Sequence, residues 1–158
     1  LFRSGQTPIE KVTLPLRSRD ELPPILAGLQ WIYQTPEINE PIFALLETKV
    51  VGGKKATGRP GLDLWHILVL GVVRLGLDCD YDRLEVLGNH YSLLRLILGL
   101  SAILAADEKP FHYKTLSHNV CLVDEALLHE INALVAQAGR AAHSKVVGRC
   151  PFRRRCSS

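Results

Sequence analysis

The chain has 158 residues, and 47% of them are hydrophobic. It is therefore long enough for one domain with a hydrophobic core, and too apolar to be disordered as a whole. The net charge of +3 is unevenly distributed, because residues 1–60 have a balance of +2, residues 61–139 of −5 and residues 140–158 of +6. Two basic segments that flank an acidic middle favour a polyanionic partner, although a charged run is as often simply solvated surface.

No segment is suited to a membrane or to secretion. The apolar run Leu64–Leu77 has fourteen residues and contains His66 and Arg74, whereas a helix that spans a bilayer needs about twenty apolar residues. The first residues lack the charged and apolar regions of a secretory leader, and the four cysteines form no C-x-x-C pair. We therefore expect a cytoplasmic protein with reduced thiols and no membrane partner.

The first third of the chain predicts two helices. Residues 1–19 contain two prolines and predict an irregular N-terminal arm. Asp20 is suited to cap a helix over residues 21–34, in which apolar side chains recur at helical spacing. A Thr-Pro step then ends this helix, and Asn39 is suited to cap a second one. The two helices predict a helical hairpin over residues 20–50.

Residues 51–62 predict a basic, glycine-rich linker. The segment carries three cations, Lys54, Lys55 and Arg59, among four glycines and a proline. Such an arm beside a helical domain is suited to the phosphates or the minor groove of DNA, and a solvated linker explains it equally well.

Residues 63–140 predict a helical domain, and residues 141–158 a disordered basic tail. The expected helices of the domain cover residues 64–76, 82–88, 91–99, 115–120 and 125–138. Gly88-Asn89, Gly99 and Gly139 are expected to end three of them, because these residues tolerate left-handed backbone angles. No segment alternates polar and apolar residues for long enough to predict a strand, so the predicted fold class is all-α.

Two parts of this domain are candidates for contact with DNA. Helices 82–88 and 91–99 predict a helix-turn-helix unit, in which Tyr91 and Arg95 would reach bases or phosphates. The second helix is apolar enough to belong to the core instead.

The segment 111–119 is the more polar candidate. Its candidate contact residues are Lys114, Thr115, Ser117, His118 and Asn119. The lysine suits phosphate, and the other four are able to bond base edges or the backbone. The alternative is an ordinary polar helix start.

No pattern predicts catalysis or a bound metal. His112 and His118 lack further ligands at suitable spacing, and Cys150 and Cys156 lie in the expected tail. No Ser or Cys has a recognisable activating context. We therefore expect no catalytic residue, no metal site and no cofactor.

The order of these elements resembles the N-terminal DNA-binding domain of bacterial insertion-sequence transposases. These are DDE-type proteins of the IS-four/IS-five superfamily, and the similarity is closest to the group labelled ISNCY. The resemblance extends over about residues 20–140 of the sequence. Its motifs are Gly58-Arg59-Pro60, an apolar helix, an acidic-aromatic step at 80–83, Leu-Gly-Leu at 98–100, Phe111–Asn119 and a helix that ends at Gln137-Ala-Gly139.

The resemblance implies a function in DNA binding. In that family the N-terminal domain binds the terminal inverted repeats, and an RNase H-like domain with three carboxylates and two divalent metals cuts and joins DNA. We therefore expect a truncated bacterial transposase that binds double-stranded DNA and is not itself an enzyme. From His143 the sequence departs from the family, as out-of-frame translation or a genuine basic tail would.

Two alternatives stay open. The amphipathic helices near 21–47 and 125–138 would also suit a protein–protein module, which associates with itself or inhibits full-length transposase. A non-functional pseudogene product is the other alternative.

Overall fold

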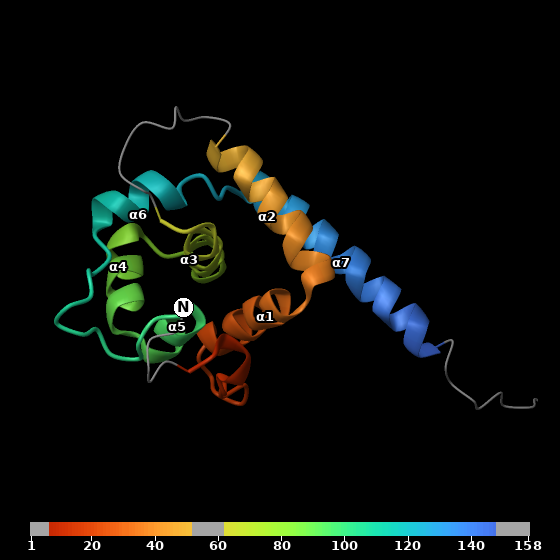
Figure 1. Ribbon diagram of the computed structural model, residues 1–158, viewed down its shortest axis with the longest axis horizontal. Helices are drawn as coiled ribbons and strands as arrows, with labels where there is room; N and C mark the ends of the chain where they lie inside the picture. Colours follow the sequence, from red (N-terminus) through yellow and green to blue (C-terminus); the bar gives the residue numbers. More distant parts are fainter. Residues whose placement is uncertain (1–6, 52–61, 148–158) are drawn as a thin grey trace, which may run out of the picture.

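The computed structural model describes residues 7–51 and 62–147, and every regular element in these ranges is helical (Figure 1). The predicted all-α fold class is confirmed. The elements are η1 (Ile9–Lys11), α1 (Leu22–Gln34), α2 (Pro36–Val51), α3 (Leu64–Leu77), α4 (Tyr81–His90), α5 (Ser92–Ile97), α6 (Tyr113–Val120) and α7 (Glu125–Val147). Within the described ranges, no helix has the length and apolar character needed to cross a bilayer.

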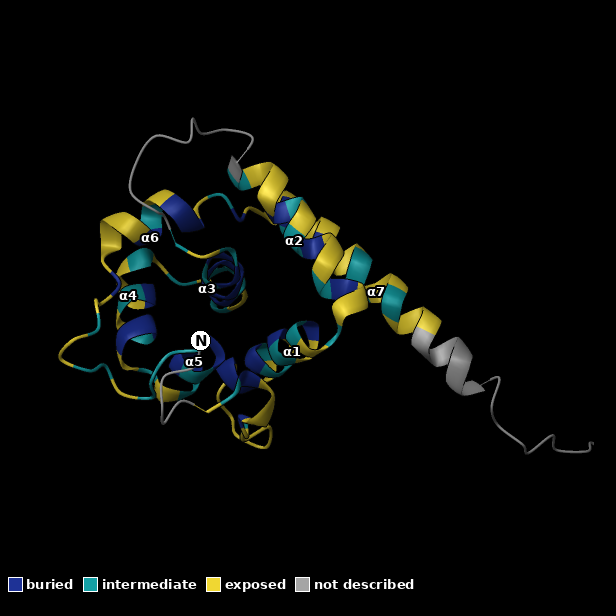
Figure 2. Ribbon diagram, viewed as in Figure 1, coloured by how far each residue is buried: buried dark blue, intermediate teal, exposed yellow. Residues whose placement is uncertain are grey.

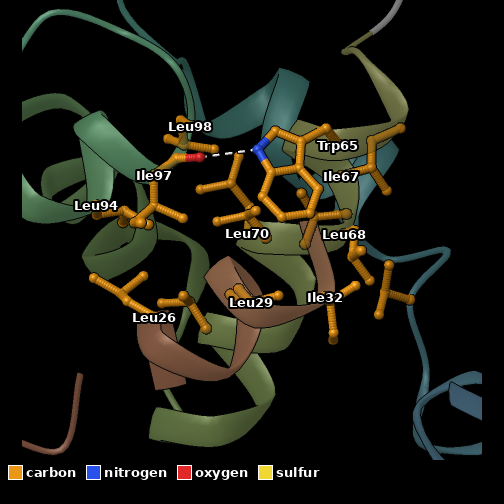
Figure 3. Close-up of a cluster of buried hydrophobic side chains, with 14 of the residues drawn as sticks. Leu26, Leu29, Ile32, Trp65, Ile67, Leu68, Leu70, Leu94, Ile97 and Leu98 are labelled. Carbon is orange, nitrogen blue, oxygen red and sulfur yellow. Dashed lines mark hydrogen bonds between the residues drawn. The ribbon is translucent and has the colours of Figure 1, made fainter. Parts of the chain in front are cut away.

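Helix α3 lies at the centre of the molecule and is seen end-on in Figure 1. It contacts α1, α2, α4 and α6, which explains why its sequence is apolar on nearly every side. Figure 3 shows its side chains packed against those of α1 and α5. Trp65 at the start of α3 donates a hydrogen bond from Nε1 to the carbonyl oxygen of Ile97, at 2.9 Å. The polar edge of this large ring is therefore satisfied inside the core.

One cluster of buried side chains has members in η1 and in all seven α-helices. The two helices predicted over residues 20–50 are present as α1 and α2, and they share this core with the helices that follow residue 62. The N-terminal arm also joins it, because Gln30 Nε2 donates to the carbonyl oxygens of Ile9 and Val12, at 2.8 and 2.9 Å. Burial of Ile9 and Val12 then attaches the arm to α1.

Several of the predicted helix ends are wrong. Gly88 and Asn89 lie inside α4, which ends at His90. Gly139 lies inside α7, which continues to Val147 and so includes the first part of the predicted tail. Helix α6 begins at Tyr113, two residues before the predicted start.

The predicted end of α5 at Gly99 is two residues too late, because the helix stops at Ile97 and Gly99 lies in the turn that follows it. Gly99 has a φ of 77°, a left-handed conformation that glycine adopts without steric cost. The N–H of Leu100 bonds to the carbonyl oxygen of Arg95 at 2.9 Å, which closes the helix end.

Candidate nucleic-acid interface

Helix α6 is held on the surface of a three-helix arrangement. The helices α3, α4 and α6 all contact one another. The inward face of α6 buries Leu116, Asn119 and Val120, whereas its other side is exposed (Figure 2). The helix is thus anchored along one face and free along the other.

The exposed side of α6 carries most of the polar residues that the sequence singled out. Lys114, Thr115 and His118 are exposed, and Ser117 is half-buried at the edge of this face. Residues three and four apart on a helix are neighbours, so Lys114, Thr115 and His118 form one continuous patch. We call these three residues the α6 face.

The N-terminus of α6 is occupied by a side chain from α4. The Glu85 carboxylate accepts a hydrogen bond from the backbone N–H of Tyr113. A negative charge at this position interacts favourably with the positive end of the helix dipole. The same charge repels a phosphate that approaches these N–H groups. The Glu85 carboxylate therefore favours side chains over these N–H groups for a phosphate contact of α6.

An aromatic contact joins the starts of α4 and α6. The rings of Tyr81 and Tyr113 meet edge to face with their centroids 6.0 Å apart. The Arg74 guanidinium of α3 lies over the Tyr81 ring, 4.5 Å from its centroid. The sequence gives no sign of this contact, because the positions of the three residues along the chain do not show that α3, α4 and α6 converge here.

Asn89 fixes the residue that leads into α6. Its Nδ2 donates to the carbonyl oxygen of Phe111 at 2.9 Å, and its Oδ1 accepts from the Phe111 N–H at 2.7 Å. Both partners are buried, so these bonds are shielded from water. They attach the end of the loop 98–112 to α4.

The prediction that Arg95 contacts DNA is wrong. Its side chain is only 1% exposed, and all three guanidinium nitrogens have partners within the chain. It donates to the carbonyl oxygens of Ser101 and Gly88, at 2.7 and 3.2 Å, and forms an ion pair with Glu108. A buried and paired guanidinium does not reach DNA, so Arg95 has a structural role.

The electrostatics of Glu108 are consistent with this role. Burial raises the pKa of Glu108, but a hydrogen bond from Ser101 Oγ and the charge of Arg95 outweigh it, and the net pKa is lowered. The carboxylate therefore remains ionised opposite the guanidinium.

Two more predicted contact residues are engaged within the chain. Asn119 is buried, and its Nδ2 donates to the carbonyl oxygen of Thr115 at 2.8 Å, which turns its amide away from the exposed face. Tyr91 donates its hydroxyl to Asp20 Oδ2 at 2.7 Å. Burial and this hydrogen bond raise the pKa of Tyr91 to about 12.

The predicted helix-turn-helix over 82–99 has an unusual connection. Only Tyr91 separates α4 from α5, whereas a helix-turn-helix normally has a turn of about three to four residues. Half of the six residues of α5 are buried, so the alternative reading of this helix as part of the core is the correct one.

The remaining predicted contacts, Lys54, Lys55 and Arg59, lie outside the described residues, as do residues 148–158 of the basic tail. In the described ranges, no group of three His, Cys, Asp or Glu side chains is arranged to hold a metal ion. A comparison of the chain with protein-family models, curated proteins and solved structures finds no match.

Proposed function

We propose that this chain binds double-stranded DNA through the α6 face, as the DNA-binding part of an insertion-sequence transposase. One observation carries the proposal. Lys114, Thr115 and His118 project from one side of a short surface helix, and the opposite side of that helix is anchored to α3 and α4. The transposase resemblance supplies the biological setting, with terminal inverted repeats as the ligand.

The shape and chemistry of α6 suit the major groove. A single α-helix fits that groove, and residues on its outer face then reach base edges and phosphates. Lys114 is the candidate phosphate contact, and Thr115 and His118 are the candidate base or backbone contacts. Because Glu85 occupies the N-terminal amide of α6, we place the phosphates beside Lys114.

The proposed activity is binding, and we assign strand cleavage and joining to the RNase H-like part of the family's proteins. Phosphate contacts release counterions, so affinity should fall steeply as the salt concentration rises. The cations Lys54, Lys55 and Arg59 would add to this term if the segment 51–62 follows the duplex.

The test compares two substitutions that remove the same charge. Lys114→Gln removes a cation from the α6 face, and Lys11→Gln removes an exposed cation from η1, which packs on α1. Fluorescence anisotropy with a labelled duplex, measured over a range of salt concentrations, gives the affinity and its salt dependence. We expect Lys114→Gln to reduce the salt slope by about 1, and Lys11→Gln to leave it unchanged. Equal effects of the two substitutions would place the contact elsewhere.

A second pair of substitutions tests whether the α6 face contacts DNA bases, independently of the phosphate contact of Lys114. Thr115→Val and His118→Ala remove no lysine or arginine from the exposed face, so a change of sequence preference reports lost base contacts. Each good base contact contributes about 1–3 kcal/mol of discrimination. If both variants retain the preference of the wild type, α6 contacts only the DNA backbone.

The interaction-module alternative is less well supported by the fold. The apolar stripes of α1 and α7 that would serve it are largely packed into the chain's own core, with Leu26, Leu29, Leu127 and Ile131 all buried. These four side chains are therefore not free for a partner helix, whereas Leu128, Leu134 and Val135 of α7 are only half-buried.

A further inference from the structure

A groove of about 500 Å³ runs between α2 and α7. Its lining is mainly small or apolar and includes Pro41, Ala44 and Leu45 of α2, and Ala133, Leu134 and Gln137 of α7. The two leucines are only half-buried, so a partner that covers them gains apolar contact. Among the described residues that line the groove, only Glu130 is charged. An occupant that brings a positive charge beside apolar side chains is therefore the best match.

Helix α7 continues well beyond the part that packs against the rest of the chain. In Figure 1 it runs beside α2 and then extends past the start of that helix. Ala138 is the last of its described side chains that packs against the core. A Cβ at Gly139 would meet no neighbouring atom within 4 Å, and Arg140 and Ala141 are exposed.

The part of α7 that follows Ala138 thus has little support within the chain. Helices obtain most of their stability from tertiary packing, and an interior glycine such as Gly139 weakens them further. A second helix laid along this part of α7 would supply the missing packing.

One face of α7 leads from the groove to this unsupported part. Residues 130, 133, 134, 137, 140 and 141 recur at intervals of three and four positions, so they lie along one side of the helix. The face has a negative charge at Glu130 and a positive charge at Arg140, ten positions or about 15 Å apart. Both side chains are exposed, and neither has an ion-pair partner among the described residues.

This face is complementary to itself. When two α7 helices run antiparallel about a twofold axis at the level of Val135, Glu130 of each chain faces Arg140 of the other. A parallel pairing would instead place like charges together, which is repulsive. The antiparallel pairing also brings the first half of each α7 along the unsupported part of the other.

We propose that a second copy of this chain occupies the α2–α7 groove with its own α7, in a symmetric antiparallel dimer. The two α2–α7 pairs then form a four-helix bundle, in which Leu45 and Leu134 become buried. Ion pairs near a surface contribute little to affinity, so apolar burial supplies most of it and the charges set the orientation. The proposal does not rest on DNA binding.

Two charge reversals test the contact without nucleic acid. In a dimer of Glu130→Lys chains, both ion pairs become contacts between two cations. In a dimer of Arg140→Glu chains, both become contacts between two anions. A heterodimer with one chain of each kind has two attractive pairs again, so the two variants should associate with each other better than with themselves.

Sedimentation equilibrium of the full chain, from about 1 µM to about 1 mM, measures the association. We expect the average mass of the wild type to rise with concentration towards that of a dimer. Each reversal alone should weaken the dimer on the order of tenfold, and an equimolar mixture should recover the affinity of the wild type. The mixture contains the same two chains, so its recovery also shows that both variants are folded.

A second pair of variants tests the groove itself. Ala133→Gln places a longer side chain in the groove and should weaken the dimer by a similar factor. Asn132→Gln is the control, because Asn132 is exposed on α7 and does not line the groove. It should associate as the wild type does.

Four results would overturn the proposal. They are a wild type that is monomeric at every concentration, a mass that rises past that of a dimer, charge reversals that associate as the wild type does, and a mixture that associates no better than either variant alone.

Discussion

The side-chain amide of Asn89 pairs with the backbone of Phe111 through two hydrogen bonds, in the way that one peptide group pairs with another. The two residues are 22 positions apart, and their pairing sets the point at which the chain enters α6. Gly88 lies beside this contact, and a Cβ at that position would come within 3.0 Å of the Phe111 ring. Two adjacent residues of α4 therefore position the helix that we assign to DNA.

Asn89→Ala should destabilise the fold by about 2–4 kcal/mol, because it leaves a buried N–H and a buried carbonyl oxygen without partners. Asn89→Asp keeps the acceptor for the Phe111 N–H and loses the donor to its carbonyl oxygen. Urea denaturation of both variants measures the free energy of unfolding. A loss below about 0.5 kcal/mol for Asn89→Ala would show that water replaces both bonds, contrary to the buried geometry.

The location of the helices was predictable from the sequence, because apolar spacing is a local signal. Helix ends were less predictable, because distant residues set several of them. Glu85 caps α6 from 28 positions away, so α6 starts before Thr115. Gly88 and Asn89 were expected to stop a helix, but α4 uses them for close packing and for the pairing with Phe111. Such partners leave no local pattern.

The residues of the candidate site were likewise only partly predictable from the sequence. Lys114, Thr115 and His118 were identified from their chemistry, and the structure places them together on an exposed face. Arg95 has the same chemistry as a DNA-contacting arginine, and only its burial and its pairing with Glu108 show a different role. Side-chain type thus indicated candidates, and burial separated those that are free from those that are engaged.

Two glycines of α3 form a matched pair for a test of packing. A Cβ at Gly71 would lie 2.6 Å from the Cβ of Val123, whereas one at Gly76 would lie 2.8 Å from Ile25 Cδ1, the end of a flexible side chain. Alanine is favoured over glycine in a helix by about 0.8–1 kcal/mol, and overpacking costs about 1–3 kcal/mol. This balance is a loss of about 0–2 kcal/mol, and we expect Gly71→Ala in its upper half, because the Cβ of Val123 is fixed to the backbone and cannot rotate away.

Gly76→Ala should leave the stability unchanged or raise it by up to about 1 kcal/mol, because Ile25 is able to rotate away. Thermal unfolding of the two variants gives the comparison directly. Equal effects would show that α3 moves relative to Val123 to accept a methyl group.

Removal of Arg95 should affect stability rather than DNA contact. Arg95→Met leaves the Glu108 carboxylate without its charged partner, which costs about 3–5 kcal/mol for a buried pair. We expect the lower end of this range, about 3 kcal/mol, because the Glu108 side chain is 14% exposed and so retains some solvation.

A second substitution distinguishes the ion pair from the packing around it. Arg95→Met combined with Glu108→Met removes both charges, and it should recover part of the lost stability, as replacement of a whole buried pair often does. Chemical denaturation of Arg95→Met, of Glu108→Met and of the double variant gives the three free energies of unfolding that the double-mutant cycle needs. Strictly additive losses would mean that the two side chains act independently.

The hydrogen bond from Tyr91 to Asp20 should make stability depend on pH. The pKa of Asp20 is lowered first by the hydrogen bond from the Tyr91 hydroxyl and then by the bond from the Leu22 N–H. The two bonds therefore stabilise the fold at pH values above the ordinary pKa of aspartate, about 3.9, and this stabilisation is lost as the pH falls through the lower pKa of the folded state. The pKa of Tyr91 is raised to about 12. The protonated hydroxyl therefore stabilises the fold at pH values below the ordinary pKa of tyrosine, about 10, and this stabilisation is lost as the pH rises through about 12.

Tyr91→Phe should therefore destabilise the fold between about pH 4 and pH 10, by about 0.5–1 kcal/mol because the bond is exposed. The difference from the wild type should disappear in stronger acid, where Asp20 is protonated in both chains. An NMR titration of the Asp20 carboxyl provides the direct measurement, with Tyr113→Phe as the control. In Tyr91→Phe the pKa of Asp20 should rise but stay below its ordinary value, because the Leu22 N–H still donates to Oδ1. An Asp20 pKa that is the same in Tyr91→Phe and in the wild type would contradict the proposed pairing.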